Sequence, residues 1–425
     1  MSKYAVIGFG CAGYSAAKTL RELDPEAQID VYSNTPDAPA NPMLTTYYVA
    51  GKITRDEVFP LGRKDDIVSE LGIQLYEETP VQKVLAKART VVLADGTERT
   101  YDDIVLATGS HPLVPPIPGM PDKGIYVMRT VYDADKLLKT IQGGLKSALV
   151  IGASWVGIKV VEALYAHKVP NIVLADLAPR IFPTATLPDV AEEIHRKLEQ
   201  EKGIGLFFGR GISALREEED GIVAVFSDGT EIKSDIVALC LGLRPTVNYL
   251  DKEEIEIGRG VAVDRHQRSS VPHIYAVGDC CEAEEIVNGQ RMVVNLWANA
   301  GMQGRVAARN IMGFNDEFQG NFIHNITHFL DMDFIGIGDN RAEGERLSYR
   351  APEGWTFDMV LRNGDPVCVN ILENHNLSGP AKAALIKRIN APRSRMSLEA
   401  TVALQQAGLP EEIIDKIKGE GHDNA

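Results

Sequence analysis

The chain has 425 residues, more than a single hydrophobic core usually supports, so two or three domains are expected. Its formal net charge of −15 argues against nucleic acid and anionic lipid as partners. Its five cysteines form no CxxC pair, which argues against a zinc site and a disulfide framework. The N-terminus leads directly into a strand pattern without a signal peptide, and no stretch is apolar enough to span a membrane. A cytoplasmic location is therefore expected.

The N-terminal segment has a β–α–β pattern. An apolar strand, a glycine turn, a helical pattern and a second strand follow one another at residues 4–8, 9–12, 13–22 and 28–32. The same order of elements returns at residues 148–152, 156–167 and 171–176. This repetition predicts an α/β protein with two doubly wound, Rossmann-like dinucleotide-binding domains.

The rest of the chain predicts a linker and a third domain. The proline-rich stretch 112–118 is typical of an extended connection. Runs with strand character at 334–338 and 367–372, together with an Asn363-Gly364 turn, predict an antiparallel sheet. Helical patterns follow at 378–389 and 397–418. We therefore expect a discontinuous first domain, a second domain and a C-terminal α+β domain with a helical tail, at residues 1–113 with 245–318, 114–244 and 319–425.

The first glycine turn reads Gly8-Phe-Gly10-Cys11-Ala12-Gly13, between a strand and a helix. In such a turn the first glycine permits the bend, the second lets a pyrophosphate approach the backbone, and the third lets helix and strand pack. The helix N-terminus adds N–H donors and positive potential. The turn predicts a bound dinucleotide. A βαβ turn without a ligand is the alternative reading.

Two later strands end in small-residue turns, Ala107-Thr108-Gly109-Ser110 and Gly278-Asp279. With the glycine turn before them, these motifs make the chain resemble the FAD-dependent pyridine nucleotide–disulfide oxidoreductase superfamily. Within it the chain is most similar to the branch of ferredoxin and rubredoxin reductases, apoptosis-inducing factor and the flavoprotein part of nitrite reductase. The resemblance implies FAD in the first domain and NAD(H) in the second.

The resemblance also implies which residues contact FAD. Asp279 would accept hydrogen bonds from the ribityl chain, and the segment that begins at Asn295 would border the flavin, although core packing is the alternative role for Trp297. Ser33 falls where the family usually has an acidic ribose ligand, which predicts weaker FAD binding. The implied FAD contacts are Gly8, Gly10, Cys11, Ala12, Gly13, Ser33, Asn34, Pro42, Val81, Ala107, Thr108, Gly109, Gly278, Asp279, Leu296, Trp297 and Ala298.

The second glycine turn reads Gly152-Ala-Ser154-Trp-Val156-Gly157, with serine in place of the middle glycine. Asp176 closes the next strand, where a carboxylate accepts from the ribose hydroxyls of NAD(H) and repels the 2′-phosphate of NADP(H). Arg180 lies close by and weakens that preference. By resemblance Gly242 borders the path of the nicotinamide, and an ordinary αβ turn is the alternative there.

The expected reactive edge lacks a thiol. Met43 lies near the position of the single cysteine that NADH oxidases and coenzyme A disulfide reductases of the superfamily use, and a thioether cannot form a thiolate. The resembling branch has a lysine–glutamate pair whose positions are Thr46 and Lys159 here. Thr46 and Lys159 are therefore the candidate catalytic residues. Either Lys159 supplies a cation at the flavin edge, which would raise the flavin potential, or it is a solvated helix lysine.

The sequence thus predicts an FAD-dependent oxidoreductase that takes hydride from NADH and passes electrons on without a redox-active cysteine. The acceptor is open between a carrier protein, a partner subunit, a quinone and oxygen, and a homodimer is also open. The alternative is an FAD-bearing interaction or sensor protein, or an electron-transfer subunit of a larger complex, with weak or no NADH turnover. A thiol-dependent peroxidase or disulfide reductase ranks lower because its nucleophile is missing.

Overall fold

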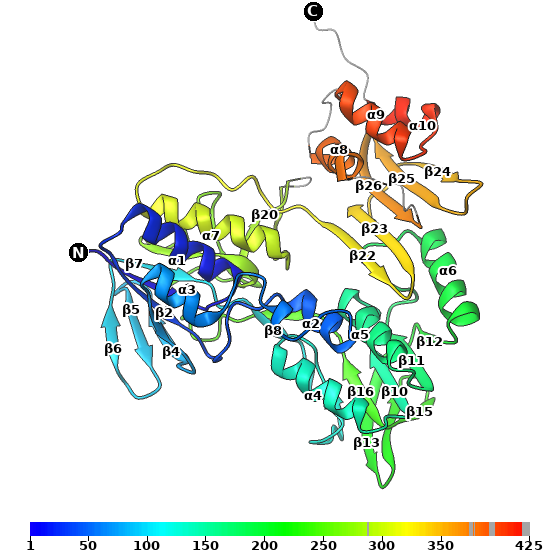
Figure 1. Ribbon diagram of the computed structural model, residues 1–425, viewed down its shortest axis with the longest axis horizontal. Helices are drawn as coiled ribbons and strands as arrows, with labels where there is room; N and C mark the ends of the chain where they lie inside the picture. Colours follow the sequence, from blue (N-terminus) through cyan, green and yellow to red (C-terminus); the bar gives the residue numbers. More distant parts are fainter. Residues whose placement is uncertain (287–288, 374–376, 378, 391–395, 419–425) are drawn as a thin grey trace, which may run out of the picture. The chain divides into compact units, whose positions relative to one another are not determined.

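The computed structural model describes residues 1–286, 289–373, 377, 379–390 and 396–418. The chain divides into two compact units (Figure 1). The first unit contains Met1–Leu113, Arg129–Lys136 and Gly242–Asn321. The second contains residues 114–128, 137–241 and the chain from 322 onward.

The first unit is built on a five-stranded parallel sheet of order β19-β7-β1-β2-β3. Its strands are β1 (Lys3–Ile7), β2 (Gln28–Tyr32), β3 (Gln74–Tyr76), β7 (Asp103–Leu106) and β19 (Ile274–Ala276). Tyr4 and Val6 face a cluster with the helices, while Ala5 and Ile7 face a second cluster. Both faces of β1 are therefore buried, which explains its unbroken apolar run.

Helices and several short strands complete the first unit. The helices that join the first cluster are α1 (Cys11–Leu23), α3 (Lys64–Leu71) and α7 (Trp297–Ile311). The antiparallel strands β4 (Val81–Leu85), β5 (Thr90–Leu93) and β6 (Glu98–Thr100) contribute to the second. Also present are α2 (Pro42–Val49), the pair β8 (Ser110–Pro112) and β17 (Leu243–Pro245), β18 (Val261–Ala262), β20 (Cys281–Glu284), β21 (Arg291–Met292) and the 3₁₀ turns η1 (Asp56–Val58) and η3 (Gly278–Cys280).

The second unit repeats the design in a parallel sheet of order β12-β11-β10-β16-β9. Its strands are β9 (Ile125–Tyr126), β10 (Ser147–Ile151), β11 (Asn171–Asp176), β12 (Gly205–Phe208) and β16 (Ile236–Leu239). The antiparallel strands β13 (Ile212–Glu218), β14 (Gly221–Phe226) and β15 (Glu231–Ser234) share a core with this sheet. The helices α5 (Trp155–Ala166) and α6 (Pro188–Arg196) belong to this unit, and the π-helical turn η2 (Lys197–Glu201) follows α6. The helix α4 (Val131–Gln142) begins in the first unit and ends in the second, because the boundary between the units falls after Lys136.

The C-terminal part of the second unit is an antiparallel sheet of order β22-β23-β26-β25-β24. Asn363 and Gly364 both have positive φ, at 54° and 80°, as the hairpin turn between β25 and β26 requires. The strands are β22 (His324–Phe329), β23 (Met332–Gly338), β24 (Glu345–Arg350), β25 (Thr356–Arg362) and β26 (Asp365–Leu372). The helices are α8 (Gly379–Asn390), α9 (Leu398–Gln406) and α10 (Glu411–Lys418), and the predicted helix start at residue 378 lies outside the described residues.

The predicted fold class is confirmed, while the grouping of segments differs from the predicted domains. Residues 129–136, expected in the second domain, belong to the first unit because Arg129 pairs with Asp279 at 2.7 Å and Asp135 pairs with Arg55 at 3.1 Å. The C-terminal sheet shares one compact unit with the second glycine turn. Buried hydrogen bonds described below account for that grouping.

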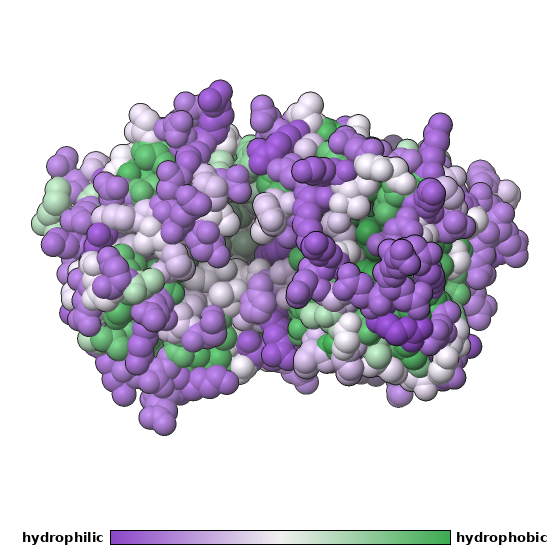
Figure 2. Space-filling model, turned by 90° about the horizontal axis from the view of Figure 1, so that it is seen from below, coloured by the Kyte–Doolittle hydropathy of each residue, from purple (hydrophilic) through white to green (hydrophobic). Residues whose placement is uncertain are grey.

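The surface in Figure 2 is mainly hydrophilic, with apolar areas scattered among polar ones. No helix within the described part of the chain has the length and apolar character that crossing a membrane requires.

Candidate dinucleotide-binding sites

The first glycine turn is shaped by close main-chain contacts. A Cβ on Gly8, whose φ is +112°, would lie 2.2 Å from the Ala107 oxygen, and a Cβ on Gly13 would lie 2.0 Å from the Gly8 oxygen. A Cβ on Gly10 would meet nothing within 4 Å. The turn therefore leaves an open place above Gly10, where the first N–H groups of α1 have no partner within the helix. This cradle fits a pyrophosphate.

Asp279 lies at the centre of a polar cluster in the same unit. Its Oδ2 accepts from the Ser110 hydroxyl at 2.9 Å and from the Arg129 guanidinium at 2.7 Å. Thr108 donates to the Thr246 carbonyl oxygen at 2.7 Å, which fixes the turn between Ala107 and Gly109. The Asp279 carboxylate is largely buried and neutralised by one cation, so it can accept from a polar ligand without an uncompensated charge.

Arg129 is absent from the predicted site. It precedes a helical pattern far from the glycine turns in sequence, and nothing in its local charge pattern distinguishes it from a surface arginine. The Arg-Thr-Val-Tyr-Asp segment does show a helix start, and the carboxylate of Asp133 accepts from the backbone N–H of Arg129 at 3.1 Å. That local bond orients the start of α4, and the long-range bond to Asp279 follows from the fold.

The N-terminus of α7 joins this region through the segment Leu296-Trp297-Ala298. The Cys11 thiol contacts the Trp297 carbonyl oxygen at 3.5 Å, and the Gln303 side chain accepts from the Gly278 N–H at 2.7 Å. Trp297 is only half-buried, which disfavours core packing as its sole role. The structure therefore brings Gly8–Gly13, Ala107–Gly109, Gly278–Asp279 and the start of α7 together.

The predicted ribose end lies at the carboxyl end of β2. The Gly8 N–H donates to the Tyr32 oxygen at 2.8 Å, so Ser33 follows directly beside the glycine turn. The Ser33 hydroxyl donates to the Thr35 oxygen at 2.9 Å, so its proton is engaged in a local turn. Asn34 is exposed, and Pro42 and Val81 begin α2 and β4. Contact of these four residues with FAD stays a prediction.

The thiols near the first site are engaged in hydrogen bonds, with Cys280 and Cys281 buried and Cys11 half-buried. Cys280 donates to the Leu106 oxygen at 3.3 Å, and Cys281 donates to the Gly278 oxygen at 3.2 Å. Burial raises the pKa of both thiols, and it raises the pKa of Cys11 to about 11. At neutral pH all three are protonated and therefore poor nucleophiles.

The start of α2 holds the two residues predicted at the reactive edge. Met43 is 43% exposed, and the buried Thr46 donates through its hydroxyl to the Met43 carbonyl oxygen at 3.1 Å. This bond within the helix occupies the Thr46 proton. A role for Thr46 beside the flavin stays a prediction.

The second glycine turn has the same construction as the first. A Cβ on Gly152, with φ +113°, would lie 2.2 Å from the Cys240 oxygen, and a Cβ on Gly157 would lie 1.8 Å from the Gly152 oxygen. Ser154 caps α5: its hydroxyl accepts from the Gly157 N–H at 3.3 Å and donates to the Cys240 oxygen at 3.1 Å. The serine thus takes up the Gly157 N–H itself, and the N–H of Val156 at the helix N-terminus is left for a pyrophosphate.

Asp176 closes β11 beside this turn. Its carboxylate accepts from the Ala153 N–H and from the Ala178 N–H, both at 2.7 Å. These bonds direct the carboxylate to the glycine turn and leave it acceptor capacity for a ribose hydroxyl. Gly242, with φ +103°, belongs to the first unit, and its predicted place beside the nicotinamide stays a prediction.

Lys159 corrects one of the two roles that the sequence left open. Its side chain is 1% exposed, so the solvated lysine was wrong. Its ammonium pairs with the carboxylate of Glu162 and donates to the His328 backbone oxygen at 2.7 Å, within the second unit. The charge is thus directed at protein groups and balanced by a neighbouring anion. These contacts favour a structural role for Lys159, and its role at the flavin edge stays a prediction.

Trp155 is a further residue that the sequence analysis missed. It occupies the second glycine turn and stacks on Phe182 at 4.3 Å between ring centroids. Phe334 of β23 stacks on Trp155 at 5.8 Å and on Phe182 at 5.4 Å. A tryptophan in so tight a turn was the available signal, but its partners come from distant parts of the sequence.

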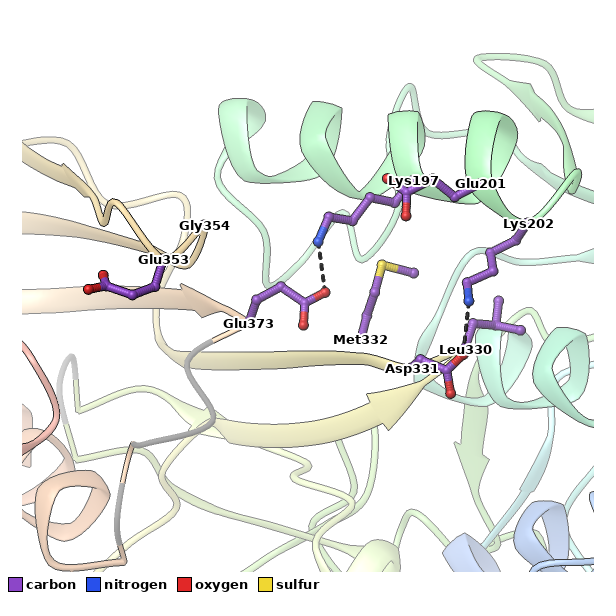
Figure 3. A pocket seen from close by; sticks show the side chains of 9 residues that line it. All are labelled: Lys197, Glu201, Lys202, Leu330, Asp331, Met332, Glu353, Gly354 and Glu373. Atoms are coloured by element: carbon purple, nitrogen blue, oxygen red, sulfur yellow. Dashed lines mark hydrogen bonds and ion pairs between the residues drawn. The ribbon is translucent and has the colours of Figure 1, made fainter.

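A cavity of about 360 Å³ lies elsewhere in the second unit (Figure 3). Two ion pairs of 2.9 Å cross it, Lys197 with Glu373 and Lys202 with Asp331. None of the residues around it belongs to a predicted site; they are Lys197, Glu201, Lys202, Leu330, Asp331, Met332, Glu353, Gly354 and Glu373. Since both lysines have carboxylate partners, we assign no ligand to this cavity.

Comparison with known proteins agrees with this geometry. Residues 2–304 match the family model described as pyridine nucleotide-disulphide oxidoreductase. The chain is 30% identical over 339 residues to an NADH oxidase of Methanocaldococcus jannaschii, covering 78% of this chain and 75% of that protein. It is 26% identical over 392 residues to the NADH-dependent phenylglyoxylate dehydrogenase subunit epsilon of Aromatoleum evansii, covering 91% of this chain and 92% of that subunit.

A solved structure with the same fold is that of a covalent putidaredoxin reductase–putidaredoxin complex. The TM-score is 0.83 at 21% identity, and the match covers 98% of both chains. The fold therefore extends through the C-terminal sheet, beyond the residues that the family model matches. The chain belongs to the pyridine nucleotide-disulphide oxidoreductase family, and it is an oxidoreductase with FAD and NAD(H) as its cofactors.

Proposed function

We propose that this chain oxidises NADH and delivers the electrons to a partner protein or subunit, without a cysteine relay. The observation that carries the proposal is the combination of two complete dinucleotide turns with Met43 at the start of α2, where a thiol would be needed for disulfide chemistry. FAD would supply the acceptance of hydride and the release of electrons. The protein's own residues would then have to bind the two dinucleotides, orient them and shield them from solvent.

The first unit supplies the groups that would hold FAD. The open place at Gly10 and the N-terminus of α1 suit the pyrophosphate, and Asp279 suits the ribityl hydroxyls. Ser110 and Arg129 hold the Asp279 carboxylate in one orientation. These contacts support noncovalent binding, since nothing among them suggests a covalent link.

The second unit supplies the groups that would hold NADH. The N-terminus of α5 suits the pyrophosphate, and the Asp176 carboxylate suits the adenosine ribose. A 2′-phosphate would be repelled by that carboxylate, so we propose NADH as the preferred donor.

A partner subunit as acceptor is supported by one relative. The A. evansii relative is by name one subunit of a dehydrogenase, and it matches this chain over nearly its whole length. An assembly would also remove the need for an internal thiol, because the electrons would leave through the partner.

The test is NADH-dependent reduction of a one-electron acceptor such as cytochrome c by the FAD-loaded wild type and by the variants Cys11→Ser, Cys280→Ser and Cys281→Ser. We expect the same rate for every variant that keeps its FAD. Loss of activity in one of these variants with FAD content unchanged would contradict the thiol-independent route. Purification from the native source should further yield the chain together with the protein that NADH then reduces.

A further inference from the structure

The C-terminal sheet holds the loop that follows Asp176. Residues 177–187 connect β11 to α6, and Ile181, Phe182, Thr186 and Leu187 in this loop are buried. Asn370 of β26 is fully buried and bonds to the loop twice: its Oδ1 accepts from the Leu187 N–H at 2.7 Å, and its Nδ2 donates to the Ala185 oxygen at 2.9 Å. One asparagine thus satisfies main-chain groups that would otherwise be buried without partners.

A second asparagine holds the same loop from the end of β23. Asn340, which is 7% exposed, donates through Nδ2 to the Pro183 oxygen at 3.1 Å and to the Thr186 oxygen at 2.9 Å. The Thr186 hydroxyl in turn donates to the Ile181 oxygen at 2.6 Å. The C-terminal sheet therefore fixes the main chain of the loop at four positions.

The loop in turn contacts the second glycine turn through a hydrogen bond and an aromatic ring. The Phe182 N–H donates to the Ala153 oxygen at 2.8 Å, and the Ala153 N–H donates to Asp176 at 2.7 Å. The Phe182 ring lies against Trp155 and Phe334. Phe182 also has φ 46°, a left-handed conformation that a bulky residue adopts only when its surroundings impose it.

The helix that begins at this turn contacts the C-terminal sheet along one face. Trp155, Lys159 and Glu162 are spaced by four and three residues, so they lie on the same side of α5. Trp155 stacks on Phe334, Lys159 donates to the His328 oxygen, and Glu162 accepts from the Leu330 N–H at 3.2 Å. Both segments that would contact NAD(H) are therefore held by the same sheet.

We infer that Asn370 and Asn340 are positioning residues for NAD(H) binding: they hold loop 181–187, and through Phe182 and Ala153 that loop sets the second glycine turn. This inference rests on the NADH-dependent function proposed above. Neither asparagine needs to touch the dinucleotide. If their removal leaves the turn competent for about a tenth of the time, the apparent Kd rises about tenfold.

The experiment compares the FAD-loaded wild type with Asn370→Ser and Asn340→Ser. Each variant independently removes the side-chain hydrogen bonds from one asparagine to the loop. Arg388→Gln is the matched control, because buried Arg388 bonds to the Ile417 oxygen and Asp365 within the C-terminal part and has no described bond to the loop. Calorimetric titration with NAD⁺ measures binding. Hydrogen exchange without any dinucleotide measures order in residues 150–158 and 177–187.

We expect both asparagine variants to weaken NAD⁺ binding about tenfold and to exchange faster in these two segments, with FAD content unchanged. Arg388→Gln should have the wild-type Kd for NAD⁺ and the wild-type rates of hydrogen exchange in both segments. Wild-type binding and exchange in a folded asparagine variant, or equal losses in Arg388→Gln, would overturn the inference. If one asparagine variant does not fold, the other decides.

The two proposals fail in different ways. A wild type that binds no NAD⁺ contradicts the proposed function. In that case the exchange comparison still shows whether the asparagines order the glycine turn, because it uses no dinucleotide.

Discussion

The ammonium of Lys159, one turn into α5, donates a hydrogen bond of 2.7 Å to the backbone oxygen of His328 in the C-terminal sheet. These residues are 169 positions apart in the sequence. The Glu162 carboxylate pairs with the same ammonium and also accepts from the Leu330 N–H at 3.2 Å. One buried ion pair thus joins the helix of the second glycine turn to the turn between β22 and β23.

Lys159→Met should destabilise the second unit by about 3 kcal/mol, because it leaves the Glu162 carboxylate buried without its cation. Glu162→Gln should cost a similar amount, and the double variant should lose less than the sum of the two. Chemical denaturation followed by tryptophan fluorescence measures this in a Trp297→Phe background, where both remaining tryptophans lie in the second unit.

The control for this cycle is Lys233→Met in the same unit. Lys233 has a side chain 43% exposed and pairs with Glu218 at 3.0 Å, so its loss should cost under about 1 kcal/mol. The buried pair would be contradicted if Lys159→Met lowered the free energy of unfolding as little as Lys233→Met. It would also be contradicted if the loss in the double variant equalled the sum of the losses in Lys159→Met and Glu162→Gln.

Gly10→Val should yield a folded protein without FAD. A Cβ at this position meets no protein atom within 4 Å and φ is −87°, so the apoprotein should lose no more than about 1 kcal/mol of stability. The side chain would instead fill the place of the pyrophosphate. Flavin released on denaturation, measured by absorbance, should fall to near zero.

Gly13→Ala is the contrasting variant. Its Cβ would lie 2.0 Å from the Gly8 oxygen, so this change should disrupt the packing of α1 on the sheet and impair folding itself. Full flavin content in Gly10→Val would refute the first site.

The glycine turns could be predicted because their geometry is local in character. Each turn needs glycine where strand, helix and a neighbouring main chain meet, and the sequence shows that spacing directly. The antiparallel C-terminal sheet was predictable for a similar reason, since Asn363-Gly364 fits only a tight turn with positive φ.

Other features depend on partners that no local pattern identifies. Arg129 reaches Asp279 across 150 positions, and Asn370 reaches Ala185 across 185. The solvated alternative for Lys159 was wrong because the family comparison pointed to an absent partner, whereas Glu162, three residues further along α5, was already suitably spaced for an ion pair.

Asp176 should determine the preference for NADH. Asp176→Asn keeps an oxygen acceptor for one of the two backbone N–H groups and removes the charge, so the ratio of kcat/KM for NADH over NADPH should fall on the order of tenfold. Asp220→Asn removes an equal charge from an exposed position in the same unit and should leave the ratio unchanged. A wild type that prefers NADPH would show that the role given to Asp176 is wrong.

Cys11 should react slowly with iodoacetamide at pH 8. Burial raises the pKa of its thiol to about 11, so the reactive thiolate should be on the order of a hundredfold scarcer than in an unperturbed cysteine. Because the pKa of the folded thiol lies above the ordinary value, the rate of alkylation should be low at pH values below that pKa. The rate should rise as the pH approaches the pKa. Peptide mapping across a pH series measures this, and a plateau reached by pH 8 would indicate an activated thiol.

The most direct measurement is anaerobic stopped-flow mixing of the FAD-loaded protein with NADH, with the visible absorbance of the oxidised flavin as the signal. We predict rapid loss of that absorbance with NADH and slower loss with NADPH. An oxidised flavin spectrum that persists in the presence of excess NADH would contradict the proposed oxidoreductase and favour a protein in which FAD serves structure or sensing.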